Sequence, residues 1–181
     1  MKKAFTMMEL IFVLVVMGII AAVVLPNTRS NPVAEAGVEL ASQIRFTQHL
    51  ALINDKYATD ATWYKNRWQI VFSGTDNNFY SVVSDNNTTF AKDPLKGLPI
   101  QDVALTGVSL SFTGGCNGKT TLSFDHLGRP LVGSLAAMTQ PYVAAGTNGE
   151  LLSSDCTITI TDGSENSVIT LTRETGYVKL Q

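Results

Sequence analysis

The first part of the chain carries its longest apolar run. Residues 5–25 contain a single charged side chain, Glu9, and the run is preceded by Lys2 and Lys3. As an α-helix this run would be about 32 Å long, which is enough to cross the hydrocarbon core of a bilayer. Because lysines favour the cytoplasmic side, the pattern predicts a single-pass membrane helix over residues 5–25 with a cytoplasmic N-terminus.

A conventional secretory signal peptide is the weaker interpretation of this segment. Such signals have an apolar run of about 7–15 residues, followed by a cleavage site with small residues. Here the run is longer, and Ile20 stands where a small residue should precede the pair Ala21-Ala22.

A second helical segment follows a proline-containing break. Pro26 lacks an N–H and should bend or end the first helix, whereas the pair Asn31-Pro32 is typical of a helix start. From residue 33 to about residue 57, apolar residues recur at helical spacing. The stripe expected to pack on the rest of the protein consists of Val33, Leu40, Ile44 and Ala51, with Phe46, Leu50, Ile53 and Tyr57 alongside.

The remainder of the chain, residues 58–181, has the alternating pattern of β-strands separated by turn residues. Residues 88–104 and 131–155 are expected to form long, irregular surface loops. The sequence therefore predicts an α+β protein, with an N-terminal helix packed on a C-terminal antiparallel β-domain. The predicted strands are 68–72, 79–84, 107–112, 120–124, 156–161, 167–173 and 176–180.

Composition adds two exclusions. The chain of 181 residues has 45% hydrophobic and only 15% charged residues, which rules out a disordered solvating protein. Its formal net charge of −2 rules out a protein that attracts nucleic acid through its total charge, although a small basic patch would not show in the total.

Cys116 and Cys156 allow two interpretations. Neither belongs to a C-x-x-C motif, and His49 and His126 are not spaced to join them as zinc ligands. In an exported domain the pair should form a disulfide that closes a loop of about 40 residues and stabilises the fold by roughly 4 kcal/mol. In a cytosolic protein they would be free thiols. The N-terminal segment favours export, and with it the disulfide.

Glu9 is the unusual residue of the apolar run. A carboxylate at the centre of a membrane helix costs roughly 2.5–3.5 kcal/mol, and no Lys or Arg within residues 5–25 can pair with it. A cut after Ala4 would supply a partner, because Phe5 would then carry a cationic amine that Glu9 of a neighbouring subunit could neutralise. A partly solvated Glu9 at the membrane interface is the other interpretation. The residues alone do not decide between the two.

The segment K-K-A-F-T-M-M-E-L at residues 2–10 resembles the class III signal of type IV pilins and type II secretion pseudopilins. The resemblance implies that a prepilin peptidase cuts between Ala4 and Phe5 and methylates the new amine of Phe5. It also implies that Glu9 guides the assembly of subunits into a filament. Ala4 departs from the family's usual Gly before the cut, but it is also a small residue.

Gly18 and Pro26 stand where this family commonly has a helix glycine and a helix-kinking proline. The whole N-terminal part then resembles the long, kinked spine helix of pilins. The implied parts of the chain are a leader (1–4), a spine helix (5–57, membrane-spanning over 5–25 and kinked near 26–31) and a β-rich domain (58–181).

Two stretches of the β-rich part resemble the GspH/FimT group of minor pseudopilins. Residues 122–130, L-S-F-D-H-L-G-R-P, are similar to their strand-and-turn F-x-x-x-G-R feature. Residues 169–178, I-T-L-T-R-E-T-G-Y-V, are similar to their closing strand and glycine-containing turn. The resemblance implies a two-sheet β-domain of this type.

The sequence contains no recognisable catalytic constellation. His126 follows an aspartate, but no G-x-S-x-G elbow occurs, and a surface turn histidine is the simpler interpretation. His49 is assigned no role. The oxygen-rich loops 76–78 and 85–87 are ordinary turn chemistry because no glutamate follows at EF-hand spacing, so we predict no metal and no cofactor.

DNA binding needs separate consideration. Some FimT-like pilins act in DNA uptake through basic C-terminal residues, which makes Arg129, Arg173 and Lys179 candidate DNA contacts. The stretch T-G-Y-V-K at residues 175–179 has one lysine, and a tyrosine where a basic G-R-x-R-like pattern would be needed. A few phosphate contacts would give only weak, salt-sensitive binding.

The sequence therefore predicts a non-enzymatic structural subunit, a minor pilin or pseudopilin of a bacterial type II secretion system or type IV pilus. Its expected partners are the prepilin peptidase, the other subunits of the filament, the inner-membrane assembly platform and the membrane. We expect it in the inner membrane with its C-terminal domain in the periplasm, and in the filament after assembly. The alternatives are a DNA-binding or adhesive tip pilin and a membrane-anchored periplasmic enzyme.

Overall fold

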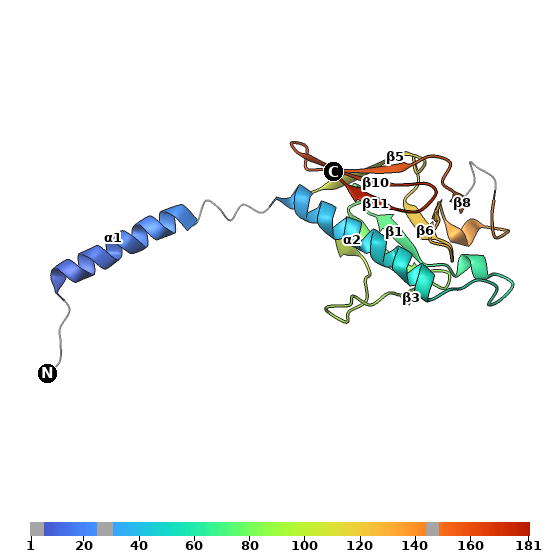
Figure 1. The fold of residues 1–181 in the computed structure, drawn as a ribbon, viewed down its shortest axis with the longest axis horizontal. Helices are drawn as coiled ribbons and strands as arrows, with labels where there is room; N and C mark the ends of the chain where they lie inside the picture. Colours follow the sequence, from blue (N-terminus) through green and yellow to red (C-terminus); the bar gives the residue numbers. More distant parts are fainter. Residues whose placement is uncertain (1–5, 25–30, 144–148) are drawn as a thin grey trace. The chain divides into compact units, whose positions relative to one another are not determined.

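The structure is a computed structural model that describes residues 6–24, 31–143 and 149–181. The chain divides into two compact units, Met1–Asn31 and Pro32–Gln181. Both are drawn in Figure 1, and each is described by itself.

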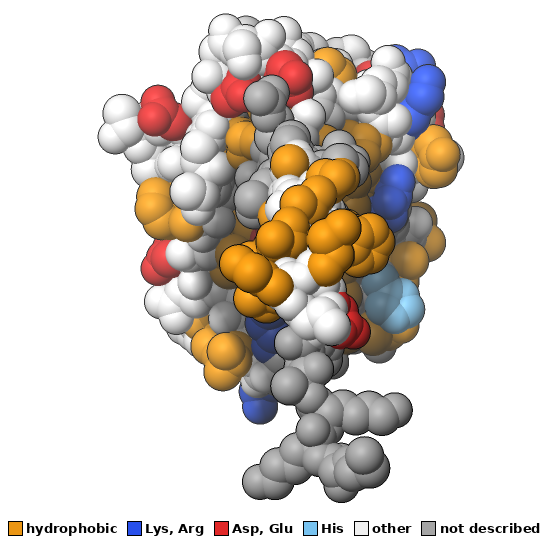
Figure 2. Space-filling view, turned by 90° about the vertical axis from the view of Figure 1, so that its left-hand side faces the viewer, with side chains coloured by type: hydrophobic (Ala, Val, Ile, Leu, Met, Phe, Trp, Pro, Cys, Tyr) orange, Lys and Arg blue, Asp and Glu red, His pale blue; other side chains and the backbone are white. Residues whose placement is uncertain are grey.

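The described part of the first unit is helix α1, Met7–Val24. Its sequence is apolar on every face, so no stripe of polar residues marks a side that would face water. The apolar side chains described on this helix are exposed, and they are orange in Figure 2. Within the described parts of the chain, no helix combines the length and the apolar character needed to cross a membrane. The membrane span expected over residues 5–25 stays a prediction.

Three expectations for the N-terminal segment concern residues outside the described parts of the chain. They are the cut between Ala4 and Phe5, the methylation of Phe5 and the kink at Pro26. These also stay predictions.

The second unit begins with helix α2, Pro32–Ile53. The helix starts where the Asn31-Pro32 pair predicts, and one face of it is buried against the β-domain. The four residues of the predicted stripe are among the buried ones, which confirms the face that the periodicity indicated. The buried residues of α2 are Val33, Ala36, Gly37, Leu40, Ala41, Ile44, Thr47 and Ala51.

The predicted helix over residues 33–57 is too long at its C-terminal end. Helix α2 ends at Ile53, and the side chains of Ile53 and Tyr57 are 65% and 52% exposed rather than buried. The carboxylate of Asp55 accepts a hydrogen bond from the N–H of Tyr57 (2.7 Å). This local side-chain to backbone bond stabilises a turn that competes with further helix.

The β-domain consists of two antiparallel sheets. The larger sheet has the strand order β3-β2-β1-β6-β7-β8, with β4 paired to β2, and the smaller has the order β11-β10-β9-β5. The strands of the larger sheet are β1 (Gln69–Ser73), β2 (Phe79–Ser84), β3 (Thr89–Phe90), β4 (Val103–Ala104), β6 (Thr121–Phe124), β7 (Pro130–Val132) and β8 (Glu150–Leu151). The strands of the smaller sheet are β5 (Ser109–Gly114), β9 (Cys156–Thr161), β10 (Asn166–Leu171) and β11 (Val178–Leu180). Two short 3-10 helices, η2 (Trp63–Lys65) and η3 (Leu135–Ala137), lie outside the sheets.

The core lies where α2 and the two sheets meet. Helix α2 packs on β9, β10 and β11 of the smaller sheet and on β1 and β6 of the larger one, as Figure 1 shows. Alternation along β9 turns Cys156, Ile158 and Ile160 inward. The ring centroids of Phe72 on β1 and Phe112 on β5 lie 5.0 Å apart, and this contact connects the two sheets. The predicted α+β class, with a helix packed on antiparallel sheets, is confirmed.

Each predicted strand corresponds to an observed strand whose ends differ by only a residue or two. The two predicted loops, 88–104 and 131–155, are less irregular than expected, because they also contain β3, β4, most of β7, β8 and η3. Strands of two residues are too short to show alternation in the sequence. They are defined by distant partners, such as Leu131 on β7 for Leu151 on β8.

Candidate functional site

Thr6 caps the N-terminus of α1. The backbone N–H of Glu9 donates to the Thr6 carbonyl oxygen (3.1 Å) and to Thr6 Oγ1 (3.3 Å). The sequence T-M-M-E has the spacing of a capping box, in which a Thr and a Glu three residues later satisfy free N–H groups at a helix start, and the bond from the Glu9 N–H to Thr6 Oγ1 is one half of that motif. A carboxylate in the first turn also interacts favourably with the helix dipole. The sequence carries this signal, but our sequence analysis did not use it.

The carboxylate of Glu9 is exposed, and none of the described residues forms an ion pair with it. Its expected partner, the amine of Phe5 in a neighbouring subunit, lies outside the described residues. Glu9 therefore has two candidate roles, which are local stabilisation of the helix start and pairing with another chain.

The two motif-bearing stretches, residues 122–130 and 169–178, meet at Gln48 of α2. The Nε2 group of Gln48 donates to the carbonyl oxygens of Gly128 (2.8 Å) and Thr175 (3.0 Å). We call these three residues the Gln48 clamp. It fastens the turn after β6 and the turn after β10 to the same helix, so the two turns are positioned together.

Two glycines allow these turns to touch. Gly128 and Gly176 have φ values of +79° and +66°, in the left-handed region that favours glycine. A Cβ atom at Gly176 would lie only 2.6 Å from the carbonyl oxygen of Gly128. Both the conformation and the close approach therefore require glycine at position 176.

Asp125 organises the turn after β6. Its carboxylate is fully buried, and Oδ1 accepts the backbone N–H groups of Leu127 (3.0 Å) and Arg129 (2.9 Å). Oδ2 accepts Nε (2.8 Å) and Nη2 (2.7 Å) of Arg129 and the hydroxyl of Tyr142 (3.4 Å). The hydrogen bond from Arg129 to Asp125 raises the pKa of the Arg129 guanidinium. The F-x-x-x-G-R feature is thus a turn closed by a buried carboxylate and its arginine.

The candidate DNA contacts lie on separate elements. Arg129 is bound to Asp125, and Arg173 donates from Nη1 to the carbonyl of Ser153 (3.0 Å) and pairs with Glu174 (3.2 Å). Lys179 is exposed on β11. On the face drawn in Figure 2, the Lys and Arg side chains lie apart from one another rather than in one patch.

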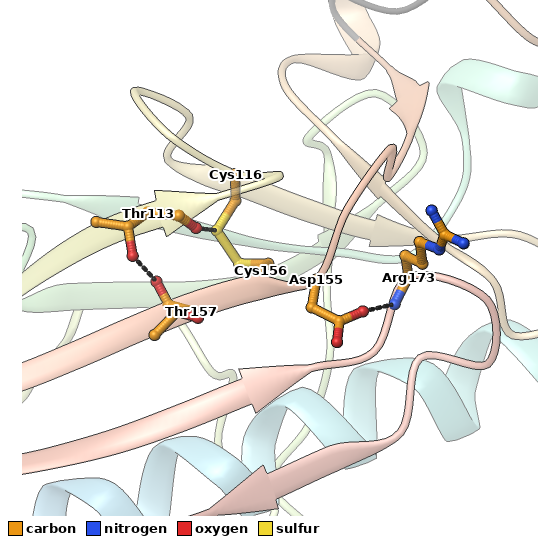
Figure 3. Close-up of a disulfide and its surroundings, with 6 residues drawn as sticks. All are labelled: Thr113, Cys116, Asp155, Cys156, Thr157 and Arg173. Atoms are coloured by element: carbon orange, nitrogen blue, oxygen red, sulfur yellow. Dashed lines mark hydrogen bonds between the residues drawn. A yellow bond between two sulfur atoms is a disulfide. The ribbon is translucent and has the colours of Figure 1, made fainter.

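The predicted disulfide is confirmed, and both cysteines are fully buried. Cys116 and Cys156, with Cα atoms 5.1 Å apart, join the loop after β5 to the start of β9 (Figure 3). Beside the bridge, the carboxylate of Asp155 accepts the backbone N–H of Arg173 (2.9 Å). The turn after β10 is therefore connected to the cross-linked region as well as to α2.

In the parts of the chain that the structure describes, no group of three or more His, Cys, Asp or Glu side chains lies together to hold a metal. In the loop 85–87, Asp85 instead pairs with Lys56 (2.9 Å). Burial raises the pKa of Asp85, but the hydrogen bonds with Lys56, Thr89 and Ser84 and the charge of Lys56 together outweigh this effect, so the net pKa is lowered. His126 packs its ring on that of Tyr57, with centroids 4.5 Å apart. His49 is exposed on α2.

No protein-family model and no curated protein matches the sequence. Among solved structures, the chain is similar to the minor pseudopilin EpsH from the type 2 secretion system of Vibrio cholerae. The two are 12% identical with a TM-score of 0.49, and the match covers 83% of this chain and 97% of that chain. With an identity this low and a TM-score below 0.5, we base the proposal below on the residues of this chain.

Proposed function

We propose that this chain is a structural, non-enzymatic subunit, a minor pilin or pseudopilin of a type II secretion system or type IV pilus. The observation that carries the proposal is helix α1, Met7–Val24, which is apolar on every face and has one carboxylate, in its first turn. Exposed apolar surface of this extent requires lipid or other protein to cover it. Lipid would cover α1 before assembly, and the helices of neighbouring subunits would cover it in the filament.

The leader pattern supports processing of the chain before assembly. Residues 2–10 carry the two lysines, the small residue Ala4, Phe5 and Glu9 at the spacing of a class III signal. In the proposed sequence of events, a prepilin peptidase cuts between Ala4 and Phe5 and methylates Phe5. The carboxylate of Glu9 then pairs with the Phe5 amine of a neighbouring subunit, which sets the register between subunits.

The proposed location is the bacterial inner membrane, with residues 5–25 inserted and the β-domain in the periplasm. The disulfide Cys116–Cys156 supports this location, because disulfides form and persist in oxidising compartments such as the periplasm. The inner-membrane assembly platform and the other subunits of the filament are the proposed partners. The Pro32–Gln181 unit would then lie at the surface or tip of the filament.

Substitution of Glu9 separates its two candidate roles. A Gln at position 9 keeps a side chain that can complete the capping box but removes the charge that pairs with an amine. We expect Glu9→Gln to reduce incorporation into sheared filaments by about tenfold or more, because the partner amine would be buried without a counter-charge. Incorporation is measured by immunoblot of the filament fraction against the membrane fraction.

The matched control is Glu35→Gln, which removes a carboxylate in the first turn of α2 instead. This variant should incorporate as the natural chain does. If Glu9→Gln assembles normally and only Glu9→Ala fails, the role of Glu9 is helix capping, and the proposed pairing between subunits is wrong.

The DNA-binding alternative has less support. Two of its three candidate contacts, Arg129 and Arg173, already bind groups within the chain. The third candidate, Lys179, is an exposed cation on β11.

A further inference from the structure

Arg67, between η2 and β1, is a buried cation. Its side chain is only 3% exposed, and its guanidinium packs on two aromatic rings. The guanidinium carbon is 4.7 Å from the ring centroid of Trp63 and 4.9 Å from that of Tyr142. Stacking of this kind is attractive because the ring faces carry negative charge.

The hydrogen-bonding edge of Arg67 is short of acceptors. Nε, Nη1 and Nη2 are all buried without a well-formed hydrogen bond, and Tyr142 is the side chain that interacts with them. The ring faces on which the guanidinium packs do not accept the N–H groups that point outward in its plane. Burial lowers the pKa of Arg67, and the nearby Tyr142 and Asp125 offset this only in part. A buried guanidinium in this state costs several kcal/mol unless something else supplies acceptors.

A small cavity adjoins this side chain. It has a volume of about 10 Å³ and is lined by Arg67 and His126, together with Trp63 and Tyr57. This volume is close to that of one water-sized occupant. The Nδ1 atom of His126 is also buried without a hydrogen-bond partner. Two side chains that have buried nitrogens without a well-formed hydrogen bond therefore line one water-sized space.

The carboxylates nearby are already committed. Asp125 is taken up by Arg129 and by backbone N–H groups, and Asp85 pairs with Lys56. Asp55 lines the cavity too, but it is solvent-exposed and accepts the N–H of Tyr57. Asp125 is thus the buried carboxylate whose charge reaches both Arg67 and Arg129, so one of these two positive charges is left uncompensated.

We propose that this cavity is a binding site for one monatomic anion of halide size, such as chloride, held by the guanidinium of Arg67 with His126 Nδ1–H as a second donor. A water molecule would fill the same volume and accept hydrogen bonds, but it would bring no charge. A halide supplies both acceptor and counter-charge, and among common anions it adds little bulk beyond that of a water molecule. The site is independent of the proposed filament role, because none of its residues belongs to α1.

The first test is the melting temperature of the full-length chain in sodium chloride, sodium bromide and sodium gluconate at equal ionic strength. Gluconate is too large for the cavity. We expect chloride and bromide to raise the melting temperature by about 2–4 °C, saturably, above the value in gluconate. Arg67→Met should abolish the difference between salts, whereas Lys92→Met, which removes an exposed cation, should leave it unchanged. Equal melting temperatures of the natural chain in the three salts would overturn the proposal.

A second measurement does not depend on whether Arg67→Met folds. Crystals of the natural chain soaked in bromide should give an anomalous peak within hydrogen-bonding distance of the Arg67 guanidinium. Bromide peaks only at surface positions, or a bromide-free cavity that holds a water molecule, would show that the cavity is a hydration site and that no halide binds there.

Discussion

At the scale of single residues, the positions of this fold that tolerate substitution least are buried polar side chains whose hydrogen bonds are all made. Asp125 is the clearest case, because its two oxygens accept bonds from Leu127, Arg129 and Tyr142. A carboxylate in this position cannot be exchanged for a similar side chain without leaving donors unsatisfied. Its neighbour Arg67 has the opposite character, since its nitrogens are buried without a well-formed hydrogen bond.

Asp125→Asn should be strongly destabilising. The Asn side chain has one accepting oxygen instead of two, and it places an NH₂ group against the guanidinium of Arg129. We expect the free energy of unfolding, measured by urea denaturation, to fall by about 3–5 kcal/mol. Asp76→Asn, at an exposed position, should change it by less than about 0.5 kcal/mol. A loss below about 1 kcal/mol for Asp125→Asn would contradict the role assigned to this carboxylate.

Single residues were predictable from the sequence where their chemistry is local. Glu9 in an apolar run and the pair Cys116 and Cys156 were recognised without a structure. Gln48 was not, because its acceptors lie 80 and 127 residues away and a glutamine in a helix carries no local signal. The same reason explains why Arg67 was missed, since only folding brings Trp63 and Tyr142 to its guanidinium.

At the scale of elements, the contact between two turns distinguishes this domain. The turn after β6 and the turn after β10 belong to different sheets, yet the Gln48 clamp holds both to α2. At Gly176 the two turns leave no room for a Cβ atom, which would lie 2.6 Å from the carbonyl oxygen of Gly128. The relative position of the sheets therefore depends on a backbone contact as well as on apolar packing.

Gly176→Ala and Gly118→Ala form a matched pair of substitutions. Both glycines have nearly the same backbone conformation, with φ values of +66° and +67°, but a Cβ atom at Gly118 would meet nothing within 4 Å. Gly118→Ala should cost only the left-handed backbone strain, about 1–2 kcal/mol. Gly176→Ala should cost about 1–3 kcal/mol more, because the turns must also move apart. Equal losses in thermal or urea unfolding would show that the turns do not depend on this contact.

Elements with a clear period were predictable, but the C-terminal end of α2 was not. The start of α2 at Pro32 and the strands of the core follow from helical spacing and from alternation. The end of α2 at Ile53 depends on the turn made by Asp55, which the apolar pattern through Tyr57 obscured. Strands as short as β3 and β4 exist only because β2 offers them a partner.

For the whole molecule, the disulfide is the main covalent constraint on the β-domain. Cys116 and Cys156 are 40 residues apart in the sequence, and the bridge limits the freedom of the unfolded chain between them. The double variant Cys116→Ala/Cys156→Ala should lose about 2–4 kcal/mol of unfolding free energy. A reducing agent should lower the melting temperature of the natural chain and leave that of the double variant unchanged. An equal response of the two would contradict a stabilising disulfide.

The architecture of the whole molecule could be predicted from the sequence better than the lipid or protein that surrounds helix α1. Apolar periodicity and alternation were enough to predict an α+β domain with a helix on antiparallel sheets. What covers α1 is not encoded in its own pattern, because lipid and neighbouring helices both suit a helix that is apolar on every face. The proposed role of the molecule depends on whether lipid and then neighbouring helices cover α1, and on the processing of its N-terminus.

Mass spectrometry of the mature protein from the membrane fraction tests the central proposal most directly, because it identifies the N-terminal residue. We predict a chain that begins at Phe5 with a methylated amine, and that loses this processing when the prepilin peptidase is inactivated. An intact Met1, or a cut near Ala22, would contradict the proposal. The segment would then be a plain anchor or an ordinary signal peptide, and the assembly role of Glu9 would be excluded.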